Sequence, residues 1–455
     1  MKRTKFITTW LIILTCQVFS LNTGAQALTP PMGWNSYNCF GSAVHEDEVR
    51  ANAMYMASFL KSYGWKYIVV DFLWSYDNPP GSRIGNPFQQ NLRDGSFVPW
   101  LTMDAFGRLL PQPTKFPSAF GGKGFKPLAD YIHTLGLQFG IHLMRGIPRQ
   151  AVWKKSPVLG TSYTADMIAD TNSTCPWMNH MYGLNMSKPG AQAYLNSLLE
   201  LYASWGVDFI KVDDIARPYS AAEVEGYRKA ITHCGRPMVL SLSPGETPLK
   251  ERNHVVQYAN MWRMADDFWD DWKEILQMFE YAKSWEGVGG PGHWPDCDMI
   301  QIGKLSKRGP VGEERFSRFT KEEEITHMTF WCIYNSPLML GGNLPENREQ
   351  ELKLFTNEEV IAVNQTGETP RQLFKTDSSM AWYSHVSGTK NIYLALFNLK
   401  NDSSLVSVNL ESLGIKGKIS IRDLWKKEDL GSFKKGFNSS LEKHSAGLFK
   451  LSYIN

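Results

Sequence analysis

The chain is 455 residues long, and 43% of its residues are hydrophobic and 13% aromatic, which is ample apolar material for a large packed core. This composition excludes intrinsically disordered, collagen-like and coiled-coil proteins. The length favours two or three domains, although one α/β barrel can occupy about 250 residues or more.

The first 27 residues predict a secretory signal peptide. Three basic residues within the first five positions precede an apolar run at 7–19, and the small-residue site Ala25-Gln26-Ala27 follows. We therefore expect an exported protein, either periplasmic or secreted. Cys16 lies in a segment that loosely resembles a lipoprotein cleavage site, so lipid anchoring is a less favoured alternative.

The formal charge of +3 comes from this leader segment. It carries three of the 48 basic residues and none of the 45 acidic ones, so the remainder of the chain has 45 of each sign. A balanced chain has no electrostatic footprint for nucleic acid or an anionic membrane surface. No later segment is apolar for long enough to span a bilayer. We expect a neutral partner such as a carbohydrate, and the oligomeric state stays open.

From about residue 30 to 365, short apolar segments alternate with amphipathic helical segments. This alternation is typical of a parallel α/β sheet that is buried on both faces. A closed barrel is favoured over an open doubly wound sheet, because several strands end in acidic residues that a barrel would gather on one face. The expected strands are 67–74, 138–144, 207–213, 237–243, 261–265 and 298–302, and the expected helices are 46–63, 125–135, 190–205, 221–234, 271–285 and 322–333.

Acidic residues at these strand ends are the candidate catalytic groups. Asp71, Asp213 and Asp267 each follow an apolar run, and Lys211 and Arg263 precede the last two in sequence. Active sites of parallel barrels lie at the carboxyl ends of the strands. Cleavage of a glycosidic bond needs two carboxyl groups, one to stabilise the oxocarbenium-like centre and one to protonate the leaving oxygen. We therefore single out Asp213 and Asp267; ordinary polar strand ends or helix N-caps are the alternative.

Residues 367–455 predict a separate C-terminal antiparallel β domain. Helical periodicity ends there, and short alternating segments are separated by polar turns such as 400–403. The expected strands are 380–385, 391–398, 404–410, 418–423 and 447–452.

No segment predicts a bound cofactor or metal. Gly287 to Gly292 match the spacing GxGxxG, but they follow a helical segment rather than a strand, so we interpret them as a loop and not as a dinucleotide site. The cysteines are widely and irregularly spaced, without the paired spacing of a zinc site.

Several ordered motifs resemble glycoside hydrolase family 27, the melibiase-type α-galactosidases. The resemblance covers nearly all of the chain after the leader, and it implies a (β/α)8 TIM barrel over residues 28–366, an antiparallel β-sandwich after it, and catalysis without a metal. The motifs are LTPPMGWNSYNCF at 28–40, VDFLW at 70–74, WGVDFIKVDD around Asp213, WRMADDFWDDW around Asp267, PDCDMIQIG at 295–303 and SPLMLGGNL at 336–344.

The resemblance also implies roles for individual residues. It makes Asp213 the nucleophile and Asp267 the general acid/base, with Lys211 and Arg263 reaching the sugar. Asp71 matches a carboxylate that holds hydroxyls of the terminal sugar. The full set of predicted substrate-binding residues is Asp71, Lys211, Arg263, Asp298, Tyr37, Trp74, His142 and Ser243.

The residues expected to form the pocket wall that selects the sugar depart from the family pattern. Phe72 stands where α-galactosidases carry the second Asp of a pair, Tyr37 replaces a Trp, and His142 replaces a Tyr. Ser243 stands where many members have Glu or another side chain facing the 2-position. Loss of a carboxylate that binds a sugar hydroxyl can redirect specificity. Reaction type is therefore predicted more securely than sugar identity.

These features predict a retaining exo-glycosidase that hydrolyses terminal α-D-galactosyl residues by double displacement. A β-L-arabinopyranosidase is the alternative within the enzymes, because that sugar shares the galactose ring arrangement and lacks its hydroxymethyl group. A catalytically silent sugar-binding barrel with a lectin-like C-terminal domain is a third hypothesis. It is disfavoured because a binding protein needs no matched acid and nucleophile.

Overall fold

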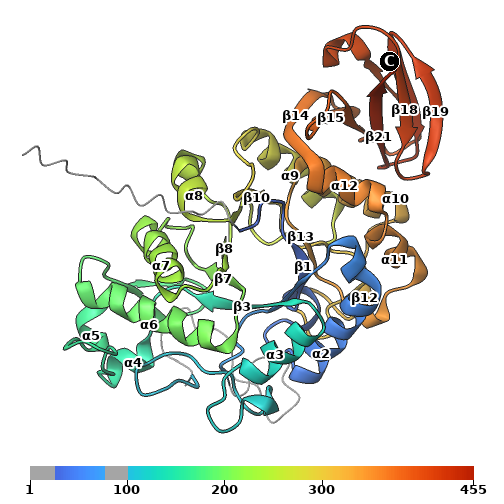
Figure 1. Cartoon of the computed structure of the whole chain (residues 1–455). Coiled ribbons are helices and arrows are strands. Elements are labelled where there is room, and N and C mark those ends of the chain that lie inside the picture. The colour runs from blue at the N-terminus through green and yellow to red at the C-terminus, as the bar shows by residue number, and fades with distance from the viewer. Residues whose placement is uncertain (1–25, 77–100, 455) are drawn as a thin grey trace, which may run out of the picture.

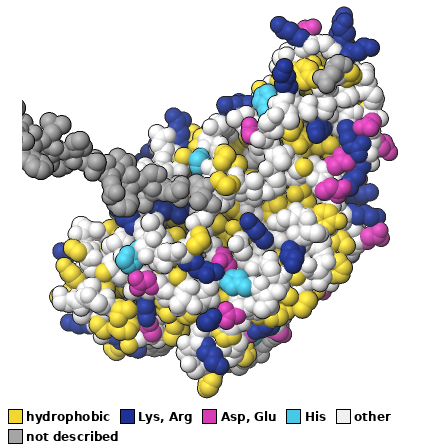
Figure 2. All heavy atoms as spheres, in the orientation of Figure 1, with side chains coloured by type: hydrophobic (Ala, Val, Ile, Leu, Met, Phe, Trp, Pro, Cys, Tyr) yellow, Lys and Arg dark blue, Asp and Glu magenta, His cyan; other side chains and the backbone are white. Residues whose placement is uncertain are grey.

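The computed structural model describes residues 26–76 and 101–454, which form a barrel and a C-terminal β domain (Figure 1). The leader up to residue 25, including Cys16, lies outside the described residues. Within the described ranges, no helix is long and apolar enough to cross a membrane. Basic and acidic side chains are interspersed on the face seen in Figure 2, in keeping with the charge balance of the chain.

Eight parallel strands in the described part of the chain form the barrel. They are β1 (Met32–Asn35), β2 (Tyr67–Val70), β3 (Gln138–Met144), β7 (Phe209–Asp213), β8 (Val239–Leu242), β9 (Met261–Arg263), β10 (Trp294–Asp296) and β13 (Leu338–Leu340). Their order in the sheet is β10-β9-β8-β7-β3-β2-β1-β13. A parallel bridge between Ile300 and Leu340 then links β13 to the segment after β10. The predicted TIM barrel is confirmed.

The strands are buried on both faces, as a parallel sheet requires. A cluster of inward side chains that includes Tyr67, Phe209, Met261 and Met339 fills the barrel interior. Helices cover the outside (Figure 1). The main ones are α2 (Glu46–Tyr55), α3 (Lys126–Thr134), α6 (Pro189–Trp205), α7 (Ala221–Cys234), α9 (Trp272–Ser284) and α10 (Lys321–Tyr334).

Local sequence explains where these helices begin and end. Pro189 occupies the first turn of α6, where its missing N–H costs nothing, and Gly206 ends the helix with a φ of 88°. Thr320 and Glu323 form a capping box at the start of α10. The predicted helix 46–63 is α-helical only as far as Tyr55 and then continues as π and 3-10 turns.

The predicted strand at 298–302 is wrong. β10 lies earlier, and in the described part of the chain residues 298–302 form a single β-bridge, at Ile300. Asp298 has a φ of 76°, and its carboxylate accepts a hydrogen bond from the Phe268 N–H and pairs with Arg263. Contacts of Asp298 with the neighbouring strand β9 and the segment after it, together with two main-chain hydrogen bonds at Ile300, therefore hold this segment instead of a strand ladder.

The C-terminal domain is an antiparallel sandwich. Its larger sheet has the order β14-β15-β16-β21-β18-β19, and β17 and β20 form a second sheet. Val406 and Phe437 of the second sheet share a core with Leu394 and Ile421 of the first. Helix α12 (Glu358–Thr366) ends directly before β14 begins. The strands are β14 (Gly367–Lys375), β15 (Ser379–Val386), β16 (Ile392–Asn398), β17 (Ser404–Asn409), β18 (Ile419–Asp423), β19 (Glu428–Phe433), β20 (Gly436–Leu441) and β21 (Ala446–Tyr453).

A small antiparallel sheet is inserted after β3 and contributes to the site. It contains β4 (Ile147–Pro148), β5 (Ala169–Thr174) and β6 (Met181–Leu184), in the order β4-β6-β5. The connection between β5 and β6 carries Trp177. The cysteines of the described residues are all free: Cys39, Cys175, Cys234, Cys297 and Cys332.

Candidate active site

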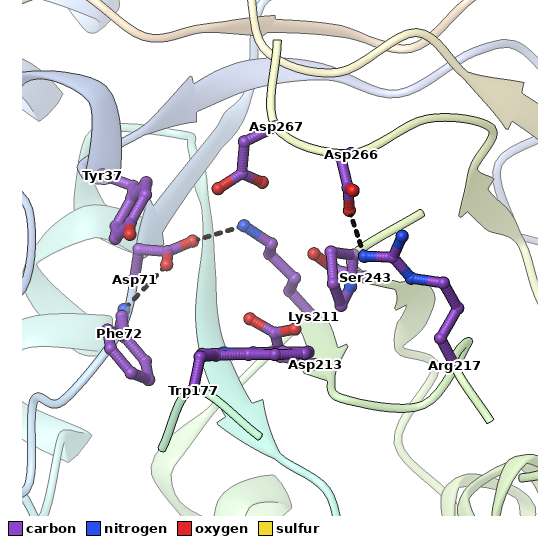
Figure 3. Close-up of a pocket in the computed structure, with 11 residues that line it drawn as sticks. Tyr37, Asp71, Phe72, Trp177, Lys211, Asp213, Arg217, Ser243, Asp266 and Asp267 are labelled. Atoms are coloured by element: carbon purple, nitrogen blue, oxygen red, sulfur yellow. Dashed lines mark hydrogen bonds and ion pairs between the residues drawn. The ribbon is translucent and has the colours of Figure 1, made fainter. Parts of the chain in front are cut away.

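A pocket of about 290 Å³ opens at the carboxyl ends of the barrel strands (Figure 3). The residues that follow β2, β7, β8 and β9 converge there, because all parallel strands end on the same face of a barrel. Its lining residues are Tyr37, Asp71, Phe72, Trp177, Lys211, Asp213, Arg217, Ser243, Pro244, Asp266 and Asp267.

Strand β7 supplies both a carboxylate and a cation to this pocket. Lys211 and Asp213 are two residues apart, so their side chains lie on the same face of the strand. One oxygen of Asp213, Oδ2, lies 2.9 Å from Nε2 of His142, and the other accepts a hydrogen bond of 2.7 Å from the Asp214 N–H. The Asp213 side chain is 15% exposed. These contacts fix its orientation toward the pocket.

Asp267 is held more loosely on the other side of the pocket. Its side chain is 43% exposed, and Nη2 of the buried Arg263 lies 3.3 Å from its Oδ1. Figure 3 shows the Asp267 and Asp213 carboxylates facing the same space from opposite sides. The two groups therefore differ in environment, one restrained and partly buried, the other open to solvent.

Asp71 and Lys211 form a buried ion pair in the pocket wall. Nζ of Lys211 lies 2.9 Å from Oδ2 of Asp71, and Asn35 donates a hydrogen bond of 2.7 Å to the same oxygen. Burial alone would raise the pKa of Asp71, but Lys211 and the hydrogen bonds outweigh burial and lower this pKa well below its usual range. Burial likewise opposes the charge of Lys211, but Asp71 and Asp213 raise the Lys211 pKa. Both groups therefore stay charged at neutral pH.

Aromatic side chains form the remaining wall beside this pair. The Phe72 ring meets the rings of Tyr37 and His142 edge to face, at centroid distances of 6.3 and 5.3 Å. Burial, followed by the nearby Asp267 and Asp71, raises the pKa of Tyr37 well above its usual value. Its phenol therefore keeps its proton and can donate a hydrogen bond. Phe72 itself is buried and offers only an apolar surface.

The rim of the pocket is polar. Nη2 of Arg217, which follows β7, lies 2.6 Å from Oδ1 of Asp266, which follows β9. Both side chains are about half exposed. Exposed pairs of this kind contribute little to stability, about 0–1 kcal/mol. Because both side chains are partly exposed, the pair leaves polar groups accessible at the rim of the pocket.

The structure brings six of the predicted site residues into the lining. They are Asp213, Asp267, Asp71, Lys211, Tyr37 and Ser243.

Four other predicted substrate-binding residues lie behind the lining. His142 contacts Asp213, and Arg263 contacts Asp267. Oδ1 of Asp298 lies 2.7 Å from Nη1 of Arg263. Burial, with Asp267 nearby, raises the pKa of Asp298 against the opposing effect of Arg263. Trp74 donates a hydrogen bond of 2.6 Å to the His142 carbonyl and packs on Phe125 and Tyr202, so it supports the wall.

Five lining residues were absent from the predicted set: Phe72, Trp177, Arg217, Pro244 and Asp266. The family resemblance had already placed Phe72 at the pocket wall, and Asp266 adjoins a predicted acid, so adjacency in sequence could have found it. Trp177 lies in the connection between β5 and β6 of the inserted sheet and has no strand-end signature. The described residues contain no group of three or more His, Cys, Asp or Glu side chains that could hold a metal ion.

The chain resembles known glycosidases along nearly its whole length. A family model described as alpha galactosidase A matches residues 178–366, and one described as the alpha galactosidase C-terminal beta sandwich domain matches residues 377–451. A solved glycoside hydrolase family 27 β-L-arabinopyranosidase from Geobacillus stearothermophilus is 50% identical, with a TM-score of 0.90, over 96% of this chain and 99% of its own. Alpha-galactosidase 2 of Arabidopsis thaliana is 26% identical over 95% of this chain and 91% of its own.

Proposed function

Because this chain belongs to glycoside hydrolase family 27 and is a glycoside hydrolase, we propose that it is a retaining exo-glycosidase that prefers terminal β-L-arabinopyranosyl over α-D-galactosyl residues. The observation that carries this preference is the apolar wall at Phe72. The pocket volume of about 290 Å³ is small for a ligand site and suits a single terminal sugar.

Phe72 discriminates through the hydroxymethyl group that galactose carries and β-L-arabinopyranose lacks. The ring is 4% exposed and is packed against Tyr37 and His142, so it offers the sugar no hydrogen-bond partner. A hydroxyl buried without a partner costs about 1–3 kcal/mol. The 50% identity to an enzyme named a β-L-arabinopyranosidase supports the same choice.

Terminal α-D-galactosides are the second candidate substrates. The family model that matches residues 178–366 is described as alpha galactosidase A. Galactose and β-L-arabinopyranose share their ring arrangement, so the Asp71–Lys211 pair would serve the ring hydroxyls of either sugar. The choice between them therefore depends on the wall rather than on the charged pair.

The proposed reaction is a double displacement through Asp213 and Asp267. A carboxylate oxygen of Asp213 attacks the anomeric carbon, the glycosidic C–O bond breaks, and Asp267 gives its proton to the leaving oxygen. Asp267 then takes a proton from water, whose oxygen attacks the anomeric carbon and releases Asp213. Lys211 lies beside Asp71 in the same wall, where it would orient the ring hydroxyls.

A panel of nitrophenyl glycosides tests the proposed specificity. We expect faster hydrolysis of the β-L-arabinopyranoside than of the α-D-galactoside, and NMR should detect the β-L-arabinopyranose anomer as the first product. An inverted first product would contradict the retaining mechanism. A preference for α-D-galactoside would make the second candidate correct.

Two variants test the proposed roles separately. Asp213→Ala should abolish turnover. Added azide should restore cleavage of the glycoside and give a glycosyl azide of inverted configuration. Asp267→Ala should stay active on substrates with highly activated leaving groups, because these need no proton. Equal behaviour of the two variants on activated substrates would argue against separate roles.

We also propose that the chain is exported and that its leader is removed. The carbonyl of Ala27 accepts hydrogen bonds from Nε1 of Trp294, at 2.7 Å, and from the Gly292 N–H, at 3.0 Å. Cleavage after Ala25 would retain these contacts, whereas the predicted cleavage after Ala27 would lose them. N-terminal sequencing of the secreted protein distinguishes the two sites, and an intact leader would contradict removal.

A further inference from the structure

A buried charged cluster lies directly behind Asp213 and has no part in the reaction described above. Arg145 follows β3 and is 2% exposed. Its Nη1 lies 2.9 Å from Oε1 of Glu223 on α7, and its Nη2 lies 3.1 Å from Oδ2 of Asp214. The same Nη2 donates a hydrogen bond of 2.9 Å to Oγ of Ser173 on β5. Arg145 thus links the ends of β3 and β7, helix α7 and the inserted sheet at one point.

Arg145 also holds the main chain at the end of β7. Its backbone N–H donates a hydrogen bond of 3.1 Å to the Asp213 carbonyl, and its Nε donates to the Asp214 carbonyl. Asp214 has a φ of 56°, in the left-handed region that is unfavourable for most residues. This conformation lets the Asp214 N–H donate a hydrogen bond of 2.7 Å to Oδ1 of Asp213. The direction of the Asp213 carboxylate therefore depends on a turn that Arg145 bonds on both sides.

The cluster is electrostatically costly. Burial raises the pKa of Asp214 to about 6 and that of Glu223 to about 7, although Arg145 opposes both shifts. Replacing a buried ion pair with apolar residues of similar volume is often neutral or stabilising. Stability alone therefore gives little reason to place one cation and two carboxylates behind the pocket.

We infer that Arg145, Asp214 and Glu223 are a positioning unit for the nucleophile. Glu223 and Ser173 hold the guanidinium, the guanidinium fixes the turn, and the turn aims the Asp214 N–H at the Asp213 carboxylate. None of the three unit members is among the residues that line the pocket, so each acts through Asp213. The inference rests on the proposed role of Asp213.

Arg145→Lys is the main test, and Arg228→Lys is its matched control. Arg228 is also a buried arginine of the barrel, but its bonds go to the Tyr258 carbonyl, at 2.8 Å, and to Asn260, at 2.7 Å. Arg145→Lys keeps the positive charge but loses the guanidinium group that bonds the turn at Asp214. We expect kcat to fall about 100-fold, as for a misplaced reacting group, with KM nearly unchanged. Arg228→Lys should lower Tm by a similar amount and leave kcat nearly unchanged.

A leaving-group series separates this role from acid catalysis. Dinitrophenyl and nitrophenyl glycosides are compared in the wild type, Asp267→Ala and Arg145→Lys. The more activated substrate should reduce the loss of kcat in Asp267→Ala, because its leaving group needs no proton. It should leave the loss of kcat in Arg145→Lys unchanged, because nucleophilic attack by Asp213 is still required. Equal loss of kcat in the two arginine variants, or relief of Arg145→Lys by the activated substrate, would overturn the inference.

If Arg145→Lys fails to fold, the pair Asp214→Asn and Asp214→Ala replaces it. Asn tolerates the left-handed conformation and can still accept from Arg145, so its kcat should stay near that of the wild type, whereas Asp214→Ala should lower kcat at least about tenfold. Equal kcat values would overturn the inference. Failure of the proposed function looks different: the wild type itself would be inactive, or a mechanism-based label would attach elsewhere than Asp213.

Discussion

Under the proposed specificity, we expect replacement of Phe72 to change sugar selectivity. It follows Asp71 in the wall, and its ring packs edge to face against Tyr37 and His142. Phe72→Leu removes the ring but keeps the wall apolar. The Asn side chain of Phe72→Asn has nearly the same shape as the Leu side chain of Phe72→Leu, but its amide can form a hydrogen bond with a sugar hydroxyl. The pair therefore separates the space that the ring occupies from its polarity.

The expected magnitude follows from one hydroxyl. Under the proposed preference, the hydroxymethyl oxygen of a galactoside would meet the phenyl ring of Phe72 and lack a partner, which would cost about 1–3 kcal/mol or about 5- to 150-fold in kcat/KM. Phe72→Asn should recover much of this loss in kcat/KM for the galactoside, and it should not raise kcat/KM for the arabinopyranoside. Phe72→Leu should relieve crowding only, with a smaller change in the ratio.

The assay is the ratio of kcat/KM for nitrophenyl α-D-galactoside to that for nitrophenyl β-L-arabinopyranoside. We expect this ratio to rise in the order wild type, Phe72→Leu, Phe72→Asn. Thermal unfolding of each variant serves as a control, because both lose ring packing and should lose similar stability. If the three ratios agree within about twofold, a difference below about 0.5 kcal/mol, Phe72 does not set the selectivity at the hydroxymethyl position, and its proposed role is wrong.

Three further substitutions test the pocket and the electrostatics of the fold. Lys211→Met leaves Asp71 buried without its cation, so we expect urea denaturation to show a loss of about 3–5 kcal/mol; a loss below about 1 kcal/mol would contradict the strength of this pair. Trp177→Ala removes an aromatic wall, so KM should rise about tenfold, equivalent to about 1.4 kcal/mol, with kcat little changed; an unchanged KM would exclude sugar contact. Burial raises the pKa of Glu324 to about 8, so its contribution to stability is present below its ordinary pKa and lost as pH rises through 8. Glu324→Gln should therefore match the wild type in urea denaturation at acid pH and exceed it above pH 8. Glu313→Gln, at an exposed position, is the control and should change neither value; an unchanged difference across pH would contradict the shift.

Much of the barrel was predictable because its signals are local. The helix expected at 221–234 is α7 with the same limits, and the strand expected at 138–144 is β3. Both segments are long enough for several periods of their pattern. β13 has only three residues, and periodicity alone cannot identify so short a strand. It is defined by its pairing with β1, about 300 residues earlier in the chain.

The sequence by itself determined that Lys211 and Asp213 lie on one face of their strand, since alternation along a strand is a local property. It also indicated that Asp71 and Asp267 would share the pocket, because parallel strands end on one side of a barrel. Only the tertiary structure decided which neighbours complete the site. Trp177 reaches the pocket from an inserted sheet, and Asp298 lies behind Arg263 rather than against the sugar space. Such placements depend on packing between segments far apart in the chain, and no local pattern encodes them.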